Sequence, residues 1–268
     1  MVFATIESSN TNNLDDFGYE TTKIGFNIGT RFEQYDDIFF KPAFSVYHED
    51  LRTTDKASSN LKKQSGESFE VTIPYSLILD RRNQSFKTTE GYRTFFSQSL
   101  PLVTEDGSLT NTFEYNKYHE FADEMVGRLG VYLQTVNSIT SKDVRISKRS
   151  FIPSNKLRGF EPGRIGPVDG NDHVGGNYSA AVNFATDIPF LFSNIQQADF
   201  KFFVDTANVW GVDFSDTIDN SNKIRSSTGI SIDWFTPIGP LSFSVAQPIT
   251  KLSSDKTESF RFNLGTTF

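Results

Sequence analysis

Alternation of apolar and polar residues runs through most of the chain. The last residues, ESFRFNLGTTF, place Phe260, Phe262, Leu264 and Phe268 on one side of an extended strand and polar or small residues on the other. The segments GPLSFSVAQP, STGISIDWF and GNYSAAVNFAT alternate in the same way. A period of two residues predicts β-strands that each have one apolar face.

About twelve segments have this alternation, and the connections between them differ in length. The expected strands lie near residues 2–8, 19–33, 38–51, 68–80, 91–100, 111–121, 126–137, 176–187, 199–210, 224–236, 240–248 and 258–268. Short connections are expected at 33–37, 122–125 and 237–240, and long polar loops at 52–67, 101–110, 138–175, 211–223 and 249–257. Connections 81–90 and 188–198 fit this alternation of lengths less well, because each has roughly ten residues. The pattern predicts an all-β, antiparallel meander.

The polar faces of these strands favour a membrane barrel over a soluble sandwich. A soluble sheet usually turns charged residues such as Lys and Glu to water. Here the polar faces carry mainly Ser, Gly, Ala and Asn, while the apolar faces are rich in the 27 Phe of the chain. That combination is typical of a transmembrane β-barrel with lipid outside and a hydrated lumen inside. A soluble β-sandwich remains the alternative.

Composition excludes several other classes of protein. Mean hydropathy is −0.39, and no run of about 18 apolar residues exists, so a transmembrane helix is not expected. The absence of Cys excludes disulfides and thiol chemistry. A net charge of −7 without a basic stripe argues against nucleic-acid binding. The first residues, MVFATIESSN, lack the features of a signal peptide, so we expect either a cytosolic protein or a piece of a longer chain.

No motif in the sequence predicts catalysis. His48, His119 and His173 have no metal-ligand spacing, and neither a nucleophile elbow nor a phosphate-binding loop occurs. Acidic neighbours at 15–16 and 36–37 are typical of solvated turns. We therefore expect no catalytic residue, no metal site and no cofactor.

One loop has an unusual composition. The stretch SNKLRGFEPGRIGPVDGNDHVGGN, residues 154–177, has too many Gly, Pro, Asn and Asp residues to form a strand or helix. Inside it, Arg158 stands next to Gly159 and between two large apolar residues, Leu157 and Phe160. A solvated loop seldom needs that combination, although a surface turn with one exposed arginine is the simpler interpretation of these residues alone.

Several blocks of the sequence, in order, resemble the BamA family of outer-membrane protein assembly factors, also called the bacterial surface antigen family. The blocks are the Leu-Arg-Gly-Phe unit with the following IGP and GGN, then FFVDTANVW, DWFTPIGPLSFSVAQPI and FRFNLGTTF. LDRRNQSFKTTEGYRTFFSQSLP resembles an earlier strand–turn–strand of the family. The resemblance covers roughly residues 68–268 by sequence and 1–67 by pattern only.

The resemblance implies a barrel of about sixteen strands that follows several periplasmic POTRA modules. With about twelve expected strands and no such modules, residues 1–268 correspond to the C-terminal portion of that barrel, as one outer-membrane domain. The first four strands are expected to be missing.

The resemblance also implies a role for the Arg-Gly-Phe loop. In the family this loop folds back into the lumen, where its arginine pairs with acidic groups on the inner wall. Asp205 matches one family acid, while Asn183 aligns with a second and would accept a hydrogen bond from the guanidinium without supplying charge. The residues expected to hold the loop are Leu157, Arg158, Gly159, Phe160, Asn183 and Asp205.

The terminal strand resembles the sorting signal of outer-membrane barrels. Phe260, Phe262, Leu264 and Phe268 form its apolar face, and the strand would supply one side of a weak seam that an incoming chain joins by strand addition. The simpler interpretation is that the last strand of any barrel has this pattern.

The function implied is that of an insertase in the bacterial outer membrane that folds and inserts β-barrel proteins, without covalent chemistry, by edge-strand templating and local bilayer perturbation. Its partners would be the lipid bilayer, unfolded β-barrel clients and, through upstream modules, assembly lipoproteins. Two other functions remain open: a transporter of the same superfamily, either a two-partner secretion pore or a TamA-like translocation factor, and a passive porin.

Overall fold

The structure, a computed structural model, describes residues 1–13, 17–85, 87–188, 198–219, 223–236 and 239–264. One antiparallel sheet of 13 strands dominates it, in the order β1-β2-β4-β5-β6-β7-β8-β11-β12-β13-β14-β15, with β3 paired to β4. These strands are β1 (Val2–Asn13), β2 (Tyr19–Thr30), β3 (Phe32–Tyr35), β4 (Ile38–Thr53), β5 (Gly66–Asp80), β6 (Gly91–Thr104), β7 (Ser108–Ala122), β8 (Met125–Ser138), β11 (Tyr178–Asp187), β12 (Ala198–Trp210), β13 (Arg225–Thr236), β14 (Gly239–Thr250) and β15 (Phe260–Leu264). The predicted all-β antiparallel meander is confirmed.

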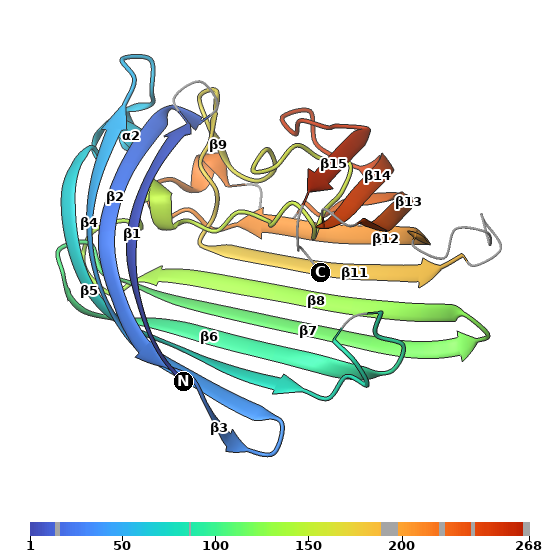
Figure 1. Cartoon of the computed structure of the whole chain (residues 1–268). Helices are drawn as coiled ribbons and strands as arrows, with labels where there is room; N and C mark the ends of the chain where they lie inside the picture. The colour runs from blue at the N-terminus through green and yellow to red at the C-terminus, as the bar shows by residue number, and fades with distance from the viewer. Residues whose placement is uncertain (14–16, 86, 189–197, 220–222, 237–238, 265–268) are drawn as a thin grey trace.

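The sheet is strongly curved and encloses a long connecting segment. Figure 1 shows β1 to β5 rising on one side and β12 to β15 on the other, with residues 139–177 on the concave side between them. That segment contains η1 (Ile146–Lys148) and a small hairpin of β9 (Val168–Asp169) and β10 (Asp172–His173). Among the described residues, β1 pairs only with β2 and β15 only with β14, so these two strands end the sheet.

Most strand predictions were accurate, with three differences in detail, while residues 189–197, 237–238 and 265–268 of the predicted segments lie outside the described residues. The first strand, expected at 2–8, extends to Asn13. The expected strand 19–33 is divided near Arg31 into β2 and β3, and both parts pair with β4. The prediction of a long loop at 101–110 was wrong, because only residues 105–107 separate β6 from β7. Pro101 pairs with Thr72 where the register of β5 and β6 shifts, and such a bulge tolerates a proline inside a sheet.

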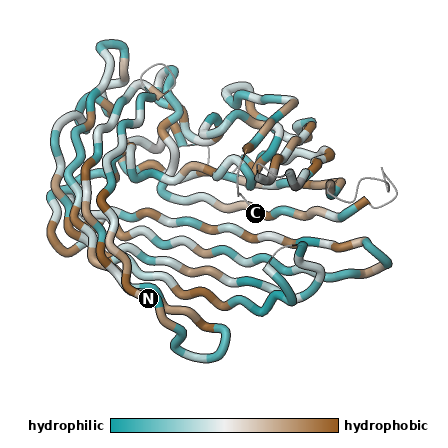
Figure 2. Tube along the Cα trace, in the orientation of Figure 1, coloured by the Kyte–Doolittle hydropathy of each residue, from teal (hydrophilic) through white to brown (hydrophobic). Residues whose placement is uncertain are grey.

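Exposure follows the predicted alternation. On β13, Ile230 is 50% exposed and Trp234 is 44% exposed, whereas the intervening Ser231 is only 4% exposed. Figure 2 shows the same change from hydrophobic to hydrophilic along neighbouring strands. Large apolar side chains are therefore exposed on the convex face, and no second large sheet covers them in the described part of the chain. This arrangement suits a lipid-facing wall and does not suit a soluble sandwich.

Loops gather at one end of the sheet around a separate apolar cluster. Ser58 caps the start of helix α2 (Ser59–Lys62), and its Oγ accepts a hydrogen bond from the Leu61 N–H at 3.2 Å. Leu61 is buried in a cluster that also contains Tyr19, Leu51, Ala57, Ile146 and Val174. In the described residues, no helix is long and apolar enough to cross a bilayer.

We predict that a charge on the apolar convex face destabilises the barrel. Val182 on β11 is half exposed between lipid-facing neighbours, so Val182→Arg should lower the free energy of unfolding by about 2–4 kcal/mol. Thr22→Arg provides the matched control, because Thr22 is exposed beside Asp50 near the loop end and should tolerate the charge. Urea titration of the protein in lipid vesicles measures both variants, and equal losses would contradict the lipid-facing assignment.

Candidate functional site

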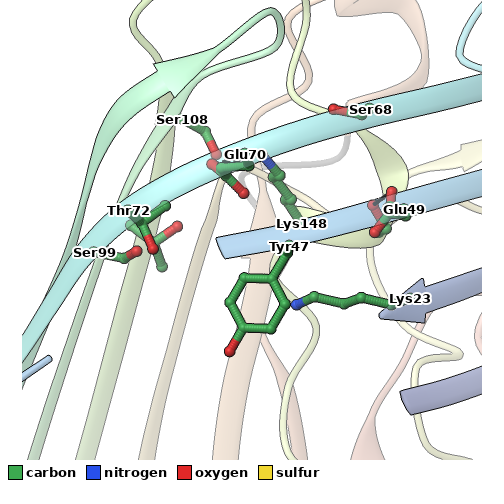
Figure 3. A pocket seen from close by; sticks show the side chains of 11 residues that line it. Lys23, Tyr47, Glu49, Ser68, Glu70, Thr72, Ser99, Ser108 and Lys148 are labelled. Atoms are coloured by element: carbon green, nitrogen blue, oxygen red, sulfur yellow. Dashed lines mark hydrogen bonds and ion pairs between the residues drawn. The ribbon is translucent and has the colours of Figure 1, made fainter. Parts of the chain in front are cut away.

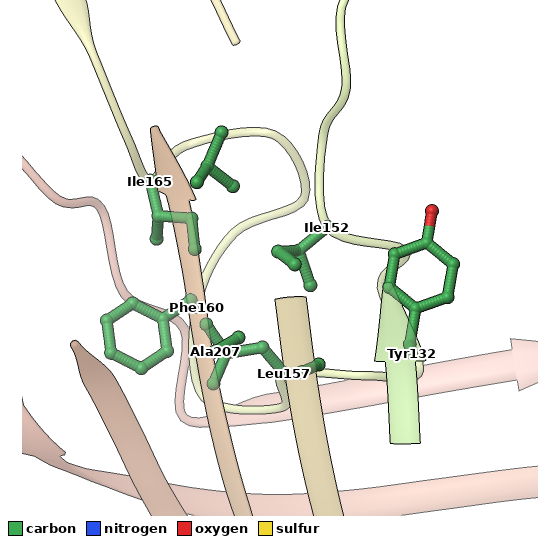
Figure 4. Packing of buried hydrophobic residues seen from close by; sticks show 8 residues of the cluster. Tyr132, Ile152, Leu157, Phe160, Ile165 and Ala207 are labelled. Atoms are coloured by element: carbon green, nitrogen blue, oxygen red, sulfur yellow. The ribbon is translucent and has the colours of Figure 1, made fainter. Parts of the chain in front are cut away.

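An apolar patch inside the sheet receives the 139–177 segment. The inward face of β12 carries Phe203, Ala207 and Val209, all buried, which is an unusual composition for a wall that faces water. A buried cluster forms on this patch (Figure 4), and its members are Tyr132, Ile152, Leu157, Phe160, Ile165, Ala181, Ala207 and Val209. Leu157 and Phe160, predicted as anchors, thus lie against the inner wall.

The Arg158 guanidinium meets the Asp205 carboxylate in a two-point contact. Its Nε lies 2.7 Å from Oδ2 and its Nη2 lies 2.8 Å from Oδ1. The Arg158 main-chain N–H donates to the same Oδ2 at 3.1 Å. The guanidinium carbon also lies 3.4 Å from the centroid of the Phe203 ring. A planar cation suits both partners, because it matches a carboxylate edge-on and stacks on an aromatic face.

Asp205 is fully buried, and hydrogen-bond donors surround its carboxylate oxygens. Besides the contacts from Arg158, Oδ1 accepts a hydrogen bond from Asn183 Nδ2 at 2.8 Å. The same Nδ2 donates to the carbonyl oxygen of Lys156 at 2.7 Å. The expected role of Asn183 as an acceptor for the guanidinium was wrong: its amide instead donates to the acid and to the loop. A second carboxylate at this position would have neither hydrogen to give.

The loop turns at Gly159 while crossing the next two strands. Gly159 has φ +87°, and a Cβ there would lie 3.1 Å from the Cβ of Ala246 on β14 and 3.3 Å from that of Ser227 on β13. Ser227 Oγ donates to the carbonyl oxygen of Arg158 at 2.5 Å. Both the left-handed backbone and the close approach explain why glycine occupies this position.

Several charged residues at the start of the segment were not predicted. Arg145 bonds to Glu49 and Asp106 at 3.2 Å each, and Arg149 pairs with Asp213. Partial burial of Asp213 opposes its ionisation, yet the Arg149 charge and the Val144 N–H outweigh burial, so the pKa of this carboxyl lies below its ordinary value. No sequence signal identified these pairs, because their members lie up to 96 residues apart.

A polar hollow lies between the segment and the inner faces of β2 to β7 (Figure 3). Lys148 pairs with Glu70 at 2.9 Å, Ser147 donates to Glu49 at 2.8 Å, and the Lys23 ammonium lies 3.9 Å from the Tyr47 ring centroid. These contacts satisfy the charges that line the hollow. Among the described residues, no group of three or more side chains is arranged to hold a metal ion.

The terminal strand presents its apolar face outward. Phe260, Phe262 and Leu264 are 59%, 49% and 65% exposed, while Phe268 lies outside the described residues. Arg261, between the two phenylalanines, is buried and reaches the Arg-Gly-Phe loop. Arg261 was not predicted as a site residue, although it joins the two predicted sites.

Comparison with known proteins gives consistent matches. Residues 2–268 match the Omp85 superfamily domain. The outer membrane protein assembly factor BamA of Neorickettsia risticii (strain Illinois) is 23% identical over 271 residues, which cover 99% of this chain and 36% of that protein. The chain therefore spans about a third of the length of this relative.

Two solved structures have a similar fold. BamA from Haemophilus ducreyi lacking POTRA domains 1–3 has a TM-score of 0.85 and 21% sequence identity, over 97% of this chain and 57% of that chain. CdiB from Acinetobacter baumannii has a TM-score of 0.60 and 11% identity, over 92% of this chain and 42% of that chain.

We predict that reversing the buried pair is only partly rescued. Asp205→Arg leaves two cations together and should cost about 3–5 kcal/mol of stability. Adding Arg158→Asp restores opposite charges, but the Asn183 amide would then face a cation and the stack on Phe203 would be lost. The temperature at which the folded barrel loses its faster gel mobility should fall for Asp205→Arg and recover partially in the double variant. No recovery would contradict a direct pair.

We also predict that Asn183→Asp destabilises the loop. The change replaces a donor 2.8 Å from Asp205 with a second carboxylate, so we expect a loss of about 2 kcal/mol at neutral pH. Asn27→Asp serves as the control, because Asn27 also faces inward but donates only to the Ser45 hydroxyl among the described contacts. Protease cleavage within 154–177 should increase for Asn183→Asp and stay low for the control. Equal cleavage of the two would exclude the donor role of Asn183.

Proposed function

Because the chain belongs to the Omp85 superfamily, whose domain matches residues 2–268, we propose that it is the barrel part of an insertase that folds β-barrel proteins into the bacterial outer membrane. BamA, named as an outer-membrane protein assembly factor, is similar over 99% of this chain. The chain is an outer-membrane β-barrel segment. Its substrates and partners are part of the proposal, since the relatives are considerably longer than this chain.

One observation carries the proposal: β15 is an end strand of the sheet in the described residues. Along Phe260–Leu264 it pairs with β14 and with no strand on its other side. Its outward side chains are apolar and exposed. A lipid-facing edge strand is the kind of element on which another chain can form main-chain hydrogen bonds.

The proposed driving force is the pairing of backbone polar groups. A client segment that enters hydrocarbon with bare N–H and C=O groups loses several kcal/mol for each group. Pairing with an exposed edge satisfies alternate groups of the client strand immediately. Each new strand then offers the next edge, so folding proceeds strand by strand and no covalent bond has to form. Local perturbation of the bilayer beside this edge would ease entry of the client.

The packed loop supports insertion over passive conduction. Leu157, Phe160 and Ile165 are buried against the inner faces of β8, β11 and β12, and the Arg158–Asp205 pair holds this part of the loop there. We propose that this contact keeps the wall beside β15 in place while the edge is used. Proposed partners are unfolded barrel clients, the lipid bilayer and, through parts of the protein outside this chain, assembly lipoproteins.

A second candidate function is transport of one dedicated partner, as in a two-partner secretion pore or a TamA-like factor. The specific observation in its favour is the fold shared with CdiB over 92% of this chain. An open ion path would be expected of a pore.

We predict that the intact protein in phosphatidylcholine vesicles speeds the folding of an unrelated small outer-membrane barrel diluted from urea, without a matching rise in ion conductance. Asp205→Asn should reduce the acceleration, because the loop loses its charged partner. Vesicles with the Thr22→Arg variant provide the control. Conductance without faster client folding would favour the transporter and reject the insertase.

A further inference from the structure

Arg261 is an inward-facing arginine on β15, and it contacts the loop rather than solvent. Its side chain is 8% exposed. The guanidinium donates to the carbonyl oxygens of Ser154 and Phe160, the latter at 2.5 Å, and to the carboxylate of Glu258. A buried guanidinium needs several acceptors at once, and here two of them are main-chain groups of the Arg-Gly-Phe loop.

The connection before β15 is bonded to the same loop through main-chain groups. Glu161 N–H donates to the Lys256 carbonyl at 3.0 Å, and Lys256 N–H donates to the Arg164 carbonyl at 3.2 Å. Glu258 N–H donates to the Gly159 carbonyl at 3.3 Å. The loop therefore acts almost as a neighbouring strand for residues 256–258.

These contacts lie on both sides of the residues that dock the loop. Arg158 is fixed to Asp205 on β12 and, through its carbonyl, to Ser227 on β13. Two residues later, Phe160 is fixed to Arg261 on β15. A loop of this geometry cannot leave β12 without pulling on β15, because few rotatable bonds separate the two attachment points.

We infer that Arg261 is a positioning residue that couples docking of the Arg-Gly-Phe loop to pairing of the terminal strand. With the loop docked, β15 has both its pairing with β14 and the Arg261 contacts. When the loop leaves Asp205, Arg261 loses its main-chain acceptors and β15 keeps its pairing with β14 without them. The edge then separates more often. The consequence for client insertion rests on the proposed function, whereas the coupling itself does not.

Hydrogen–deuterium exchange on the intact protein in lipid nanodiscs tests the coupling. Asp205→Asn keeps the side-chain shape and removes the charge that docks the loop, so amides of Phe260–Leu264 should exchange at least about tenfold faster. Arg261→Gln should have a similar effect, and the double variant should be no faster than the faster single variant. Arg261→Lys, which can still donate to one carbonyl, should be intermediate.

Arg128→Gln is the matched control. Arg128 is an inward-facing arginine on β8 whose guanidinium donates to Asn116 at 3.0 Å, so its loss should leave β15 exchange unchanged. Unchanged β15 exchange in Asp205→Asn, or additive effects in the double variant, would overturn the coupling. If Arg261→Gln is too unstable to measure, the conservative Arg261→Lys variant still tests the coupling. Its β15 amides must exchange faster than those of the wild-type protein.

Client folding measured on the same samples separates the two proposals. Faster β15 exchange with slower client folding supports both of them. Faster exchange with unchanged client folding retains the coupling and rejects edge templating. Unchanged exchange rejects the coupling even if client folding persists.

Discussion

Within hydrocarbon, every backbone N–H and C=O must find its partner inside the protein, because no water is present to bind it. A meander of long antiparallel strands meets this requirement along its whole length except at its ends. Outward residues are apolar because they face lipid, and inward residues are mostly small and polar. In the described residues β15 has a partner strand on one side only.

The same scarcity of water governs the interior where the loop packs. Asp205 is fully buried, and an isolated carboxylate there would be very unfavourable. Arg158 supplies charge and two donors, its main-chain N–H supplies a third, and Asn183 supplies a fourth. The donors come from both the wall and the loop, so the carboxylate is fully satisfied only when the loop is docked. Through Asp205, the long connection is thus held against the inner face of the barrel wall.

Sequence predicted the strands well because alternation is a local property that each strand displays by itself. The prediction failed at 101–110, because β6 continues to Thr104 past a bulge at Pro101. The pairing of Arg158 with Asp205 could be anticipated from family resemblance and is observed in the structure. The direction of the Asn183 hydrogen bond could not, because an amide carries both donor and acceptor and only its neighbours decide which is used. Arg261 looked like any polar residue on a barrel strand.

The position of Arg261 also explains how an end strand is held from inside the sheet. β15 pairs with β14 on one side. The loop adds contacts from the lumen, through Arg261 and residues 256–258. Stability that comes from a separate, removable segment can be withdrawn without breaking the sheet itself. Docking of the loop at Asp205 and pairing of the terminal strand are therefore coupled.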